Sequence, residues 1–208
     1  MTRPPRPTLL YSLIALFSWP ILRLAFRYQA RGAENLPRDG GCVLAAGHVS
    51  NLDPWALGLQ IWPRRFLRFM AKSELFWFPL SAFISRAGAF KVHRGQADRE
   101  AIETAVQLAR DGNVIAMFPE GTRRKKGLRK KYEAQAHTGA ARIALEADVP
   151  LVPAGIKGTD GLSHFAAWRV RYGPPIELDD LRDREMSEAA REATDRLMVA
   201  IHELEGSL

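Results

Sequence analysis

His48 and Asp53 stand five positions apart in the segment GHVSNLDP, and the later segment FPEGTR carries Glu120, Gly121 and Arg123. An imidazole can take a proton from a hydroxyl group near neutral pH, and a carboxylate bound to its other ring nitrogen orients it for that task. The second segment adds an acid and a cation on a loop that its glycine allows to turn. These residues offer a general base, its orienting carboxylate and a cation for an anionic substrate.

The spacing of His48 and Asp53 constrains how the chain runs between them. Five helical steps of about 100° leave two side chains on different faces, so the pair cannot meet on one straight helix. The apolar run 42–46 predicts a short buried strand, and Asp53 before Pro54 is typical of an N-cap followed by proline at the first helical position. His48 then lies in the intervening loop, where Asp53 can curl back to it. The alternative is that Asp53 only caps the helix and His48 is an ordinary loop histidine.

Length and composition bound the fold and the partners. With 208 residues and 47% hydrophobic content, the chain can bury a substantial core as one domain. Cys42 is the single cysteine, which excludes an intramolecular disulfide, and we interpret it as a small buried residue rather than a nucleophile. The formal net charge of +7 favours an anionic partner: phospholipid, nucleic acid, a phosphorylated cofactor or an acidic carrier protein.

Residues 1–28 differ from the rest of the chain. Positions 8–22 carry no charge and are rich in large apolar residues, before Arg23 and Arg27 intervene. The run is shorter than the about 20 residues that a bilayer span needs, it contains Pro20, and no clear small-x-small cleavage site follows it. We therefore expect a membrane-interface helical segment at 1–28, followed by an α/β domain at 29–208. A buried core helix is the alternative.

A second stretch, residues 62–80, interleaves cations with large aromatic side chains. Such a mixture suits a lipid headgroup boundary, where rings bury their bodies and keep their polar edges wet. It also suits single-stranded nucleic acid, whose bases stack on rings. Burial in the core is the third interpretation and the usual fate of aromatic residues.

The remaining pattern alternates between strands and helices without a linker or a repeat. The expected strands are 42–46, 66–71, 88–93, 114–118, 151–156 and 168–172. The expected helices are 54–61, 75–85, 97–110, 139–146 and 187–204. Strands separated by helices predict an α/β fold with a mostly parallel sheet covered by helices.

Several functional signatures are missing from the sequence. It contains no Gly-x-Gly-x-x-Gly, no Walker phosphate loop, no His-Glu-x-x-His and no Gly-x-Ser-x-Gly. Its five histidines show no metal-ligand spacing, so no metal site is expected. These absences count against nucleotide-binding, zinc and serine-hydrolase interpretations.

Four segments resemble the four blocks of the glycerolipid acyltransferases, in the same order. They are GHVSNLD at 47–53, KVHRG at 91–95, FPEGTR at 118–123 and VPLVP at 149–153. The similarity covers roughly residues 30–160 and is greatest to the 1-acylglycerol-3-phosphate acyltransferases, which make phosphatidic acid. The resemblance implies an acyltransferase-type α/β fold, a location at the membrane surface and an acyl-thioester donor.

A chemical mechanism follows from the residues themselves. A thioester is already activated, so the enzyme need only deprotonate an acceptor hydroxyl and hold it against the carbonyl carbon. His48 suits the base, and Asp53 would fix its tautomer and stabilise the imidazolium. This scheme requires no covalent acyl-enzyme and no cofactor beyond the acyl donor, acyl-coenzyme A or acyl-carrier protein.

The resemblance also implies substrate contacts. Arg94 and Arg123 match the second and third blocks and are expected to bind the acceptor phosphate, because guanidinium groups stay charged and offer several donors. Glu120 and Gly121 would shape the loop, with Glu120 holding an arginine or contacting the glycerol; a structural Glu120–Arg123 salt bridge is the alternative. Lys72 also matches family usage and would face anionic substrate, or be a solvated helix-end lysine.

The chain departs from the usual family pattern at two positions and adds a basic run. His93 stands where an acidic residue is common, and His137 where lysine is common, which leaves the acceptor open. The run 123–131, RRKKGLRKK, begins inside the third block. It could attract lipid headgroups, coenzyme A phosphates, an acidic carrier protein or nucleic acid, or be a solvated loop without a partner.

We therefore expect a peripheral or monotopic protein on the cytoplasmic face of the cell membrane that moves a fatty acyl group to the sn-2 hydroxyl of lysophosphatidic acid in phospholipid biosynthesis. One alternative acceptor is another lysophospholipid or lyso-aminolipid. From another class, the alternative is a non-catalytic binder of anionic membrane or nucleic acid. Acyl-chain length, the identity of the donor and the oligomeric state are not specified by the sequence.

Overall fold

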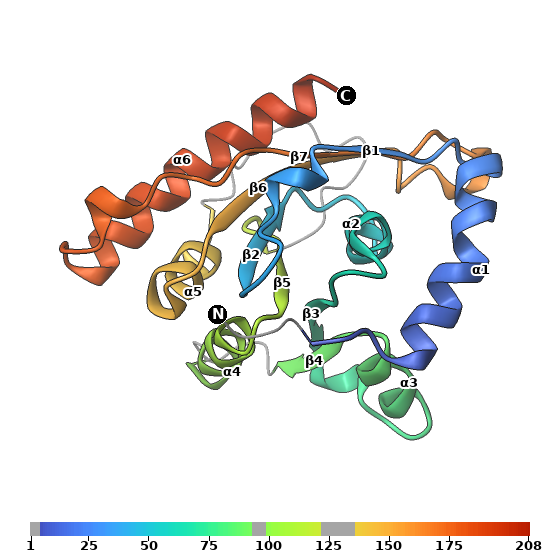
Figure 1. Ribbon diagram of the computed structural model, residues 1–208, viewed down its shortest axis with the longest axis horizontal. Coiled ribbons are helices and arrows are strands. Elements are labelled where there is room, and N and C mark those ends of the chain that lie inside the picture. Colours follow the sequence, from blue (N-terminus) through green and yellow to red (C-terminus); the bar gives the residue numbers. More distant parts are fainter. Residues whose placement is uncertain (1–4, 93–98, 122–135) are drawn as a thin grey trace.

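The computed structural model describes residues 5–92, 99–121 and 136–208, which form a sheet covered by helices (Figure 1). In these ranges the strands are β1 (Gln29–Arg31), β2 (Cys42–Ala46), β3 (Leu67–Lys72), β4 (Ala89–Val92), β5 (Val114–Met117), β6 (Leu151–Lys157) and β7 (Arg169–Tyr172). Their order across the sheet is β1-β7-β6-β2-β5-β3-β4. Neighbouring strands are parallel, except that β6 and β7 are antiparallel. The predicted mostly parallel α/β sheet is confirmed.

The helices of the described residues form a layer on each side of the sheet. They are α1 (Leu9–Ala25), α2 (Asp53–Ile61), α3 (Leu80–Arg86), α4 (Arg99–Arg110), α5 (Gly139–Ala147) and α6 (Met186–Gly206). Helices α4, α5 and α6 share one buried cluster with the sheet, while α1 and α2 share the other (Figure 1).

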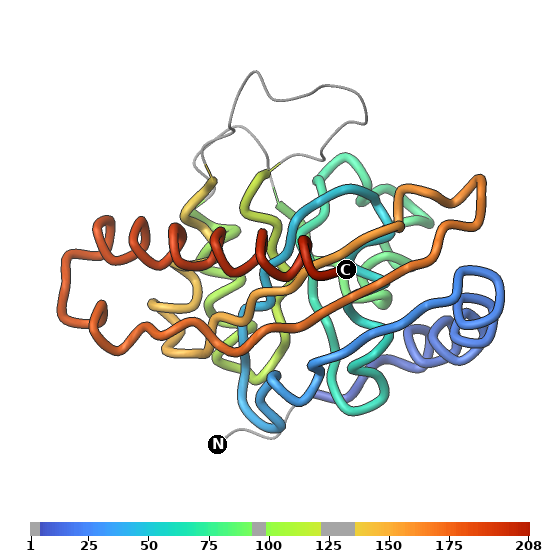
Figure 2. The backbone as a smooth tube through the Cα atoms, turned by 90° about the horizontal axis from the view of Figure 1, so that it is seen from above, coloured from blue at the N-terminus to red at the C-terminus, as the bar shows by residue number. Residues whose placement is uncertain are grey.

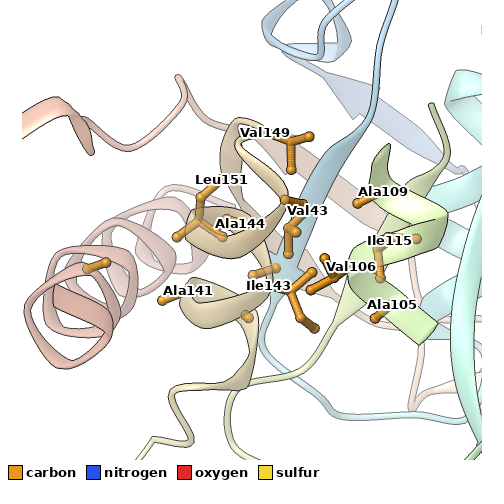
Figure 3. Close-up of a cluster of buried hydrophobic side chains, with 14 of the residues drawn as sticks. Val43, Ala105, Val106, Ala109, Ile115, Ala141, Ile143, Ala144, Val149 and Leu151 are labelled. Atoms are coloured by element: carbon orange, nitrogen blue, oxygen red, sulfur yellow. The ribbon is translucent and has the colours of Figure 1, made fainter. Parts of the chain in front are cut away.

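Strand β2 lies at the centre because its side chains are apolar in both directions. Val43 and Ala45 pack into the cluster with α4, α5 and α6, shown around Val106, Ile143 and Leu151 in Figure 3. The alternate residues of β2 pack into the cluster with α1 and α2. This two-sided burial is typical of a parallel strand covered by helices, and it explains why residues 42–46 read as one continuous apolar run.

Helix 75–85 was predicted wrongly at its start. The chain forms a short 3₁₀ segment at Ser73–Leu75, and α3 begins only at Leu80. Pro79 is the physical reason, because proline has no N–H to donate inside a helix and disfavours helical geometry at the residue before it. The exposed rings of Trp77 and Phe78 therefore lie on irregular chain.

Strand β1 was not predicted from the sequence. Its three residues, Gln29–Arg31, lie at the sheet edge and pair in parallel with β7. The segment is too short for a periodic pattern and lacks the β-branched and aromatic residues typical of strands. The other predicted elements lie within a few residues of their observed bounds, although positions 93 and 97–98 fall outside the described residues.

Helix α1 is packed on one side and bare on the other. Thr8 caps its start by accepting the Tyr11 N–H, and the buried Tyr11 ring contacts Trp55 and Phe66. Large apolar side chains on its remaining surface are exposed: Leu9, Leu13, Leu16, Phe17, Trp19, Ile21 and Leu24. Among the described residues, no helix has the length and apolar character needed to cross a bilayer.

Candidate active site

The candidate residues gather at one edge of the sheet because parallel strands end together. Strands β2 and β6 pair in parallel on one side of β2, and β2 and β5 pair in parallel on the other. The carboxyl end of β2 leads to His48, that of β6 leads to Thr159, and that of β5 leads to the 118–121 loop. Residues far apart in the sequence therefore meet at this edge.

The connections after β2 and β5 leave toward opposite faces. The chain after β2 enters α2, which belongs to one buried cluster, while the chain after β5 leads to α5, in the other. In open α/β sheets, ligands bind beyond the carboxyl ends of strands where successive connections diverge in this way. The fold therefore favours a substrate site at the His48 loop.

His48 and Asp53 are in direct contact. His48 Nδ1 lies 2.8 Å from Asp53 Oδ2; the histidine side chain is 16% exposed, and the aspartate is fully buried. A carboxylate can only accept hydrogen bonds, so Nδ1 carries the shared hydrogen and Nε2 is the ring nitrogen that can receive a proton. The predicted pairing is confirmed as geometry, and its catalytic role remains a prediction.

The buried carboxylate of Asp53 is surrounded by donors. Besides the imidazole, Oδ2 accepts the backbone N–H groups of Val49 and Ser50, each at 2.8 Å. Oδ1 accepts the hydroxyl of Thr159 at 2.5 Å. Burying a carboxylate away from water is costly unless such donors replace the water. The four donors therefore satisfy the buried Asp53 side chain and fix its orientation.

The prediction that Asp53 is the N-cap of its helix was wrong. Helix α2 starts at Asp53 itself, with Leu52 in the cap position and no side-chain cap. The carboxylate turns back toward the preceding loop, because the N–H groups of Val49 and Ser50 and the imidazole all converge there. The alternative in which Asp53 merely caps the helix fails for the same reason.

Phe118 fixes the other side of the imidazole. Its ring stacks on His48 with centroids 4.1 Å apart and planes inclined by 20°. Because Phe118 directly follows β5, this contact ties the β5 loop to the β2 loop. The histidine ring is thus oriented by Asp53 at its edge and by Phe118 at its face.

Glu120 and Gly121 lie in a turn next to the stacked pair. The Gly121 N–H donates to the Phe118 carbonyl, and Gly121 has φ +66°, a left-handed conformation that favours glycine. A Cβ at Gly121 would lie 2.7 Å from the His137 ring, and the His137 N–H donates to the Pro119 carbonyl. His137 therefore covers the turn that carries Glu120.

The cations predicted to bind phosphate are only partly described. Lys72 is the exposed last residue of β3, at the same sheet edge, and β5 separates β3 from β2. Its strand partner Val92 ends β4. Arg94, Arg123, His93 and the basic run 123–131 lie outside the described residues.

The remaining candidates for reactive chemistry are the single cysteine and a metal site. Cys42 is fully buried in β2, and burial raises the pKa of its thiol to about 12, which keeps it protonated and supports its interpretation as a core residue. Within the described ranges, no cluster of His, Cys, Asp or Glu side chains could hold a metal ion.

Comparison with known proteins shows the family of this chain. The model of the family described as Acyltransferase matches residues 27–157. The chain belongs to the acyltransferase family. This acyltransferase is 32% identical to 1-acyl-sn-glycerol-3-phosphate acyltransferase of Bacillus subtilis, over 90% of this chain and 93% of the relative.

Two further matches are a plant relative and a solved structure. It is 30% identical to the chloroplastic 1-acyl-sn-glycerol-3-phosphate acyltransferase BAT2 of Brassica napus, over 64% of this chain and 38% of that protein. Its fold matches the crystal structure of PlsC, the 1-acyl-sn-glycerophosphate acyltransferase of Thermotoga maritima, with a TM-score of 0.62 and 20% identity. The match covers 95% of this chain and 94% of that one.

Sequence reasoning assigned no role to two residues of the acyltransferase site. Phe118 stood in a recognised block, but its stacking on His48 depends on β2 and β5 being neighbours. Thr159 lies 106 positions from Asp53 and belongs to none of the four blocks. The available signal was its place just after the predicted strand 151–156.

Proposed function

We propose that this acyltransferase moves a fatty acyl group from an acyl thioester to the sn-2 hydroxyl of lysophosphatidic acid, giving phosphatidic acid. The observation that carries the proposal is the contact between His48 Nδ1 and the buried Asp53 carboxylate, which makes Nε2 the basic nitrogen. The relatives from Bacillus subtilis and Brassica napus are both named 1-acyl-sn-glycerol-3-phosphate acyltransferase, which is supporting evidence for this acceptor.

The pair supports a direct transfer. His48 Nε2 accepts the proton of the acceptor hydroxyl as its oxygen forms a bond with the thioester carbonyl carbon. Asp53 stabilises the imidazolium that results. When the tetrahedral intermediate collapses, the C–S bond breaks and the imidazolium returns its proton to the thiolate, so His48 is neutral again.

We assign the binding of the acceptor phosphate to cationic side chains. Lys72 at the end of β3 is the described candidate, and Arg94 and Arg123 are assigned from their blocks. Lysine acts as a point charge toward phosphate, whereas arginine can donate two parallel hydrogen bonds. Glu120 and Gly121 shape the turn beside Phe118, and Glu120 orients an arginine or contacts the glycerol.

The donor is acyl-coenzyme A or acyl-carrier protein, and no other cofactor enters the proposal. Both donors present an acidic surface or phosphates to a chain whose formal net charge is +7. The thioester supplies the activation, so the protein contributes only the base, the alignment and the charge stabilisation.

We further propose that the protein lies on the cytoplasmic face of the cell membrane, with α1 in the interface. Three exposed apolar segments support this: the bare side of α1, the residues around Trp77 and Phe83, and the segment with Leu162 and Phe165. All three occur at one end of the molecule (Figures 1 and 2).

Contacts between the three segments support one continuous surface. The Thr8 hydroxyl donates to the Arg86 carbonyl, which joins the start of α1 to the end of α3. Arg27 donates to the Phe165 carbonyl, and the rings of Phe26 and Phe165 are 5.4 Å apart. Apolar side chains rimmed by arginine suit the headgroup boundary of an anionic leaflet.

The proposed reaction is tested with purified protein and a panel of acceptors in mixed micelles. Lysophosphatidic acid, lysophosphatidylethanolamine, lysophosphatidylcholine and a lyso-aminolipid are each supplied with labelled acyl-coenzyme A or acyl-carrier protein. The proposal expects phosphatidic acid as the dominant product with one donor or both. Product from another acceptor, and none from lysophosphatidic acid, would contradict it.

A further inference from the structure

Thr159 makes a contact that links a third strand to the catalytic pair. Its side chain is 1% exposed, and its hydroxyl donates to Asp53 Oδ1 at 2.5 Å. We propose that Thr159 is a positioning residue that sets the orientation of the Asp53 carboxylate and, through it, the His48 imidazole. The inference rests on the proposed function, because it assigns Asp53 to the acyl-transfer step.

The argument starts from the division of donors over the carboxylate. Oδ2 receives His48 Nδ1 and two backbone N–H groups, which all lie in one short loop. Oδ1 receives Thr159 from a different part of the fold. A carboxylate held at one oxygen can rotate about its Cβ–Cγ bond, whereas donors at both oxygens fix its plane.

The plane of the carboxylate matters for the base. The hydrogen bond from His48 Nδ1 depends on its angle as well as its length, and that bond determines which ring nitrogen is protonated. Without the Thr159 hydroxyl, Oδ1 would also be a buried anionic oxygen with one donor fewer. We therefore expect the loss to act on the chemical step rather than on substrate binding.

The backbone around Thr159 is built to hold it in place. Gly158 has φ +87°, and a Cβ there would lie 2.1 Å from the Ala167 carbonyl oxygen, so only glycine fits. The Gly161 N–H donates to the Gly158 carbonyl and closes the turn. Strand β6, which leads into this turn, pairs with β2 in parallel, and β2 leads to His48.

Three variants separate positioning from mere packing. Thr159→Val keeps the shape but removes the hydroxyl, and Thr159→Ser keeps the hydroxyl but removes the methyl group. Thr194→Val is the matched control, because Thr194 is also buried and its hydroxyl donates to the Ala190 carbonyl within α6. Thr159→Ala replaces the valine variant if the latter does not fold by circular dichroism.

We expect kcat to fall about ten- to a hundred-fold in Thr159→Val, since a hydrogen bond to a charged group is lost. KM for both substrates should stay within about two-fold, and Thr159→Ser and Thr194→Val should keep wild-type kcat. An unchanged kcat in Thr159→Val, or an equal loss in Thr159→Ser, would overturn the positioning role.

A second readout does not depend on turnover. Nitrogen-15 NMR of the histidine rings reports the tautomer of His48, which should be protonated at Nδ1 in the wild type and in Thr159→Ser. Thr159→Val should shift or broaden that signal, and an unchanged signal would overturn the inference. Absence of turnover in the wild type would instead contradict the proposed function, and the NMR comparison would still decide the role of Thr159.

Discussion

His48 is oriented by contacts from three other places in the chain. Asp53 binds its Nδ1 edge, Phe118 covers its face, and Thr159 fixes the carboxylate from the far side. Each contact restricts one degree of freedom of the ring or of its partner. A base that is already aligned loses little entropy when the acceptor hydroxyl arrives, which is how orientation contributes to rate.

Replacing the Asp53 carboxylate tests its charge at this scale. In Asp53→Asn the amide oxygen can still accept the loop N–H groups, so the fold should persist, but the negative charge that stabilises the imidazolium is gone. We expect kcat to fall about 10²- to 10⁴-fold. Steady-state kinetics beside a thermal melt measure both effects, and a kcat within about three-fold of wild type would argue against the pair.

Removing an assigned cation should affect one substrate more than the other. Arg94→Ala and Arg123→Ala should each raise the KM for lysophosphatidic acid about ten-fold or more, because a charge-assisted hydrogen bond to phosphate is lost. The KM for the thioester should change little. Arg184→Ala is the control, because Arg184 pairs with Glu188 of α6 and belongs to none of the four blocks. If the thioester KM rises instead, these arginines bind the donor.

The sequence predicted the His48–Asp53 contact because the two residues are close in the chain and flanked by clear strand and helix signals. The same reasoning could not predict Thr159, which meets Asp53 only because β6 lies beside β2. It also predicted that Asp53 curls back to His48, but not that the carboxylate accepts the N–H groups of Val49 and Ser50 instead of capping its helix. Contacts that depend on strand order require the folded chain.

At the scale of elements, β2 is the strand on which the site depends. It pairs with β5 and β6 and is buried on both faces, so the loop that carries His48 leaves from a fixed point. Its apolar run predicted it with the observed bounds. The predicted helix 75–85 began too early, because its apolar residues favoured a helix despite Pro79. Strand β1 was not predicted, because its three residues are too few to show a periodic pattern.

Two neighbouring glycines test how tightly β2 is held. A Cβ at Gly41, just before β2, would lie 1.9 Å from the Ala109 carbonyl oxygen at the end of α4. Gly41→Ala should lower the free energy of unfolding by about 3 kcal/mol, because backbone must shift. Gly40→Ala meets no atom within 4 Å and should cost about 1 kcal/mol, for its left-handed φ of +71°. Urea unfolding measures the free energy of unfolding of both variants. Equal losses of stability in Gly41→Ala and Gly40→Ala would refute the close packing at Gly41.

At the scale of the whole molecule, the described structure separates two kinds of surface. One end of the molecule carries the exposed apolar side chains of α1 and of the segments near α3 and Phe165. Helix α6 lies on the face of the sheet opposite α1. The sequence indicated an apolar N-terminal helix but not the segment with Leu162 and Phe165, which joins α1 only through the fold. This arrangement would direct one end of the protein toward lipid.

Charged substitutions test that orientation. Leu24 is 82% exposed and Phe17 67%, so Leu24→Glu and Phe17→Glu should leave the fold intact. Each should lower binding to vesicles of anionic phospholipid about ten-fold or more, because an apolar side chain no longer enters the interface. Val199→Glu is the matched control, since Val199 is 59% exposed on α6. If all three variants co-sediment with the vesicles to the same extent, α1 is not the membrane contact.

The most direct test of the account is acyl transfer by the purified protein and by His48→Ala, with lysophosphatidic acid and acyl-coenzyme A or acyl-carrier protein in parallel. We expect the wild type to form phosphatidic acid and His48→Ala to form none above background, with both proteins folded by circular dichroism. Turnover that survives in His48→Ala would contradict the assignment of the base, and with it the central claim.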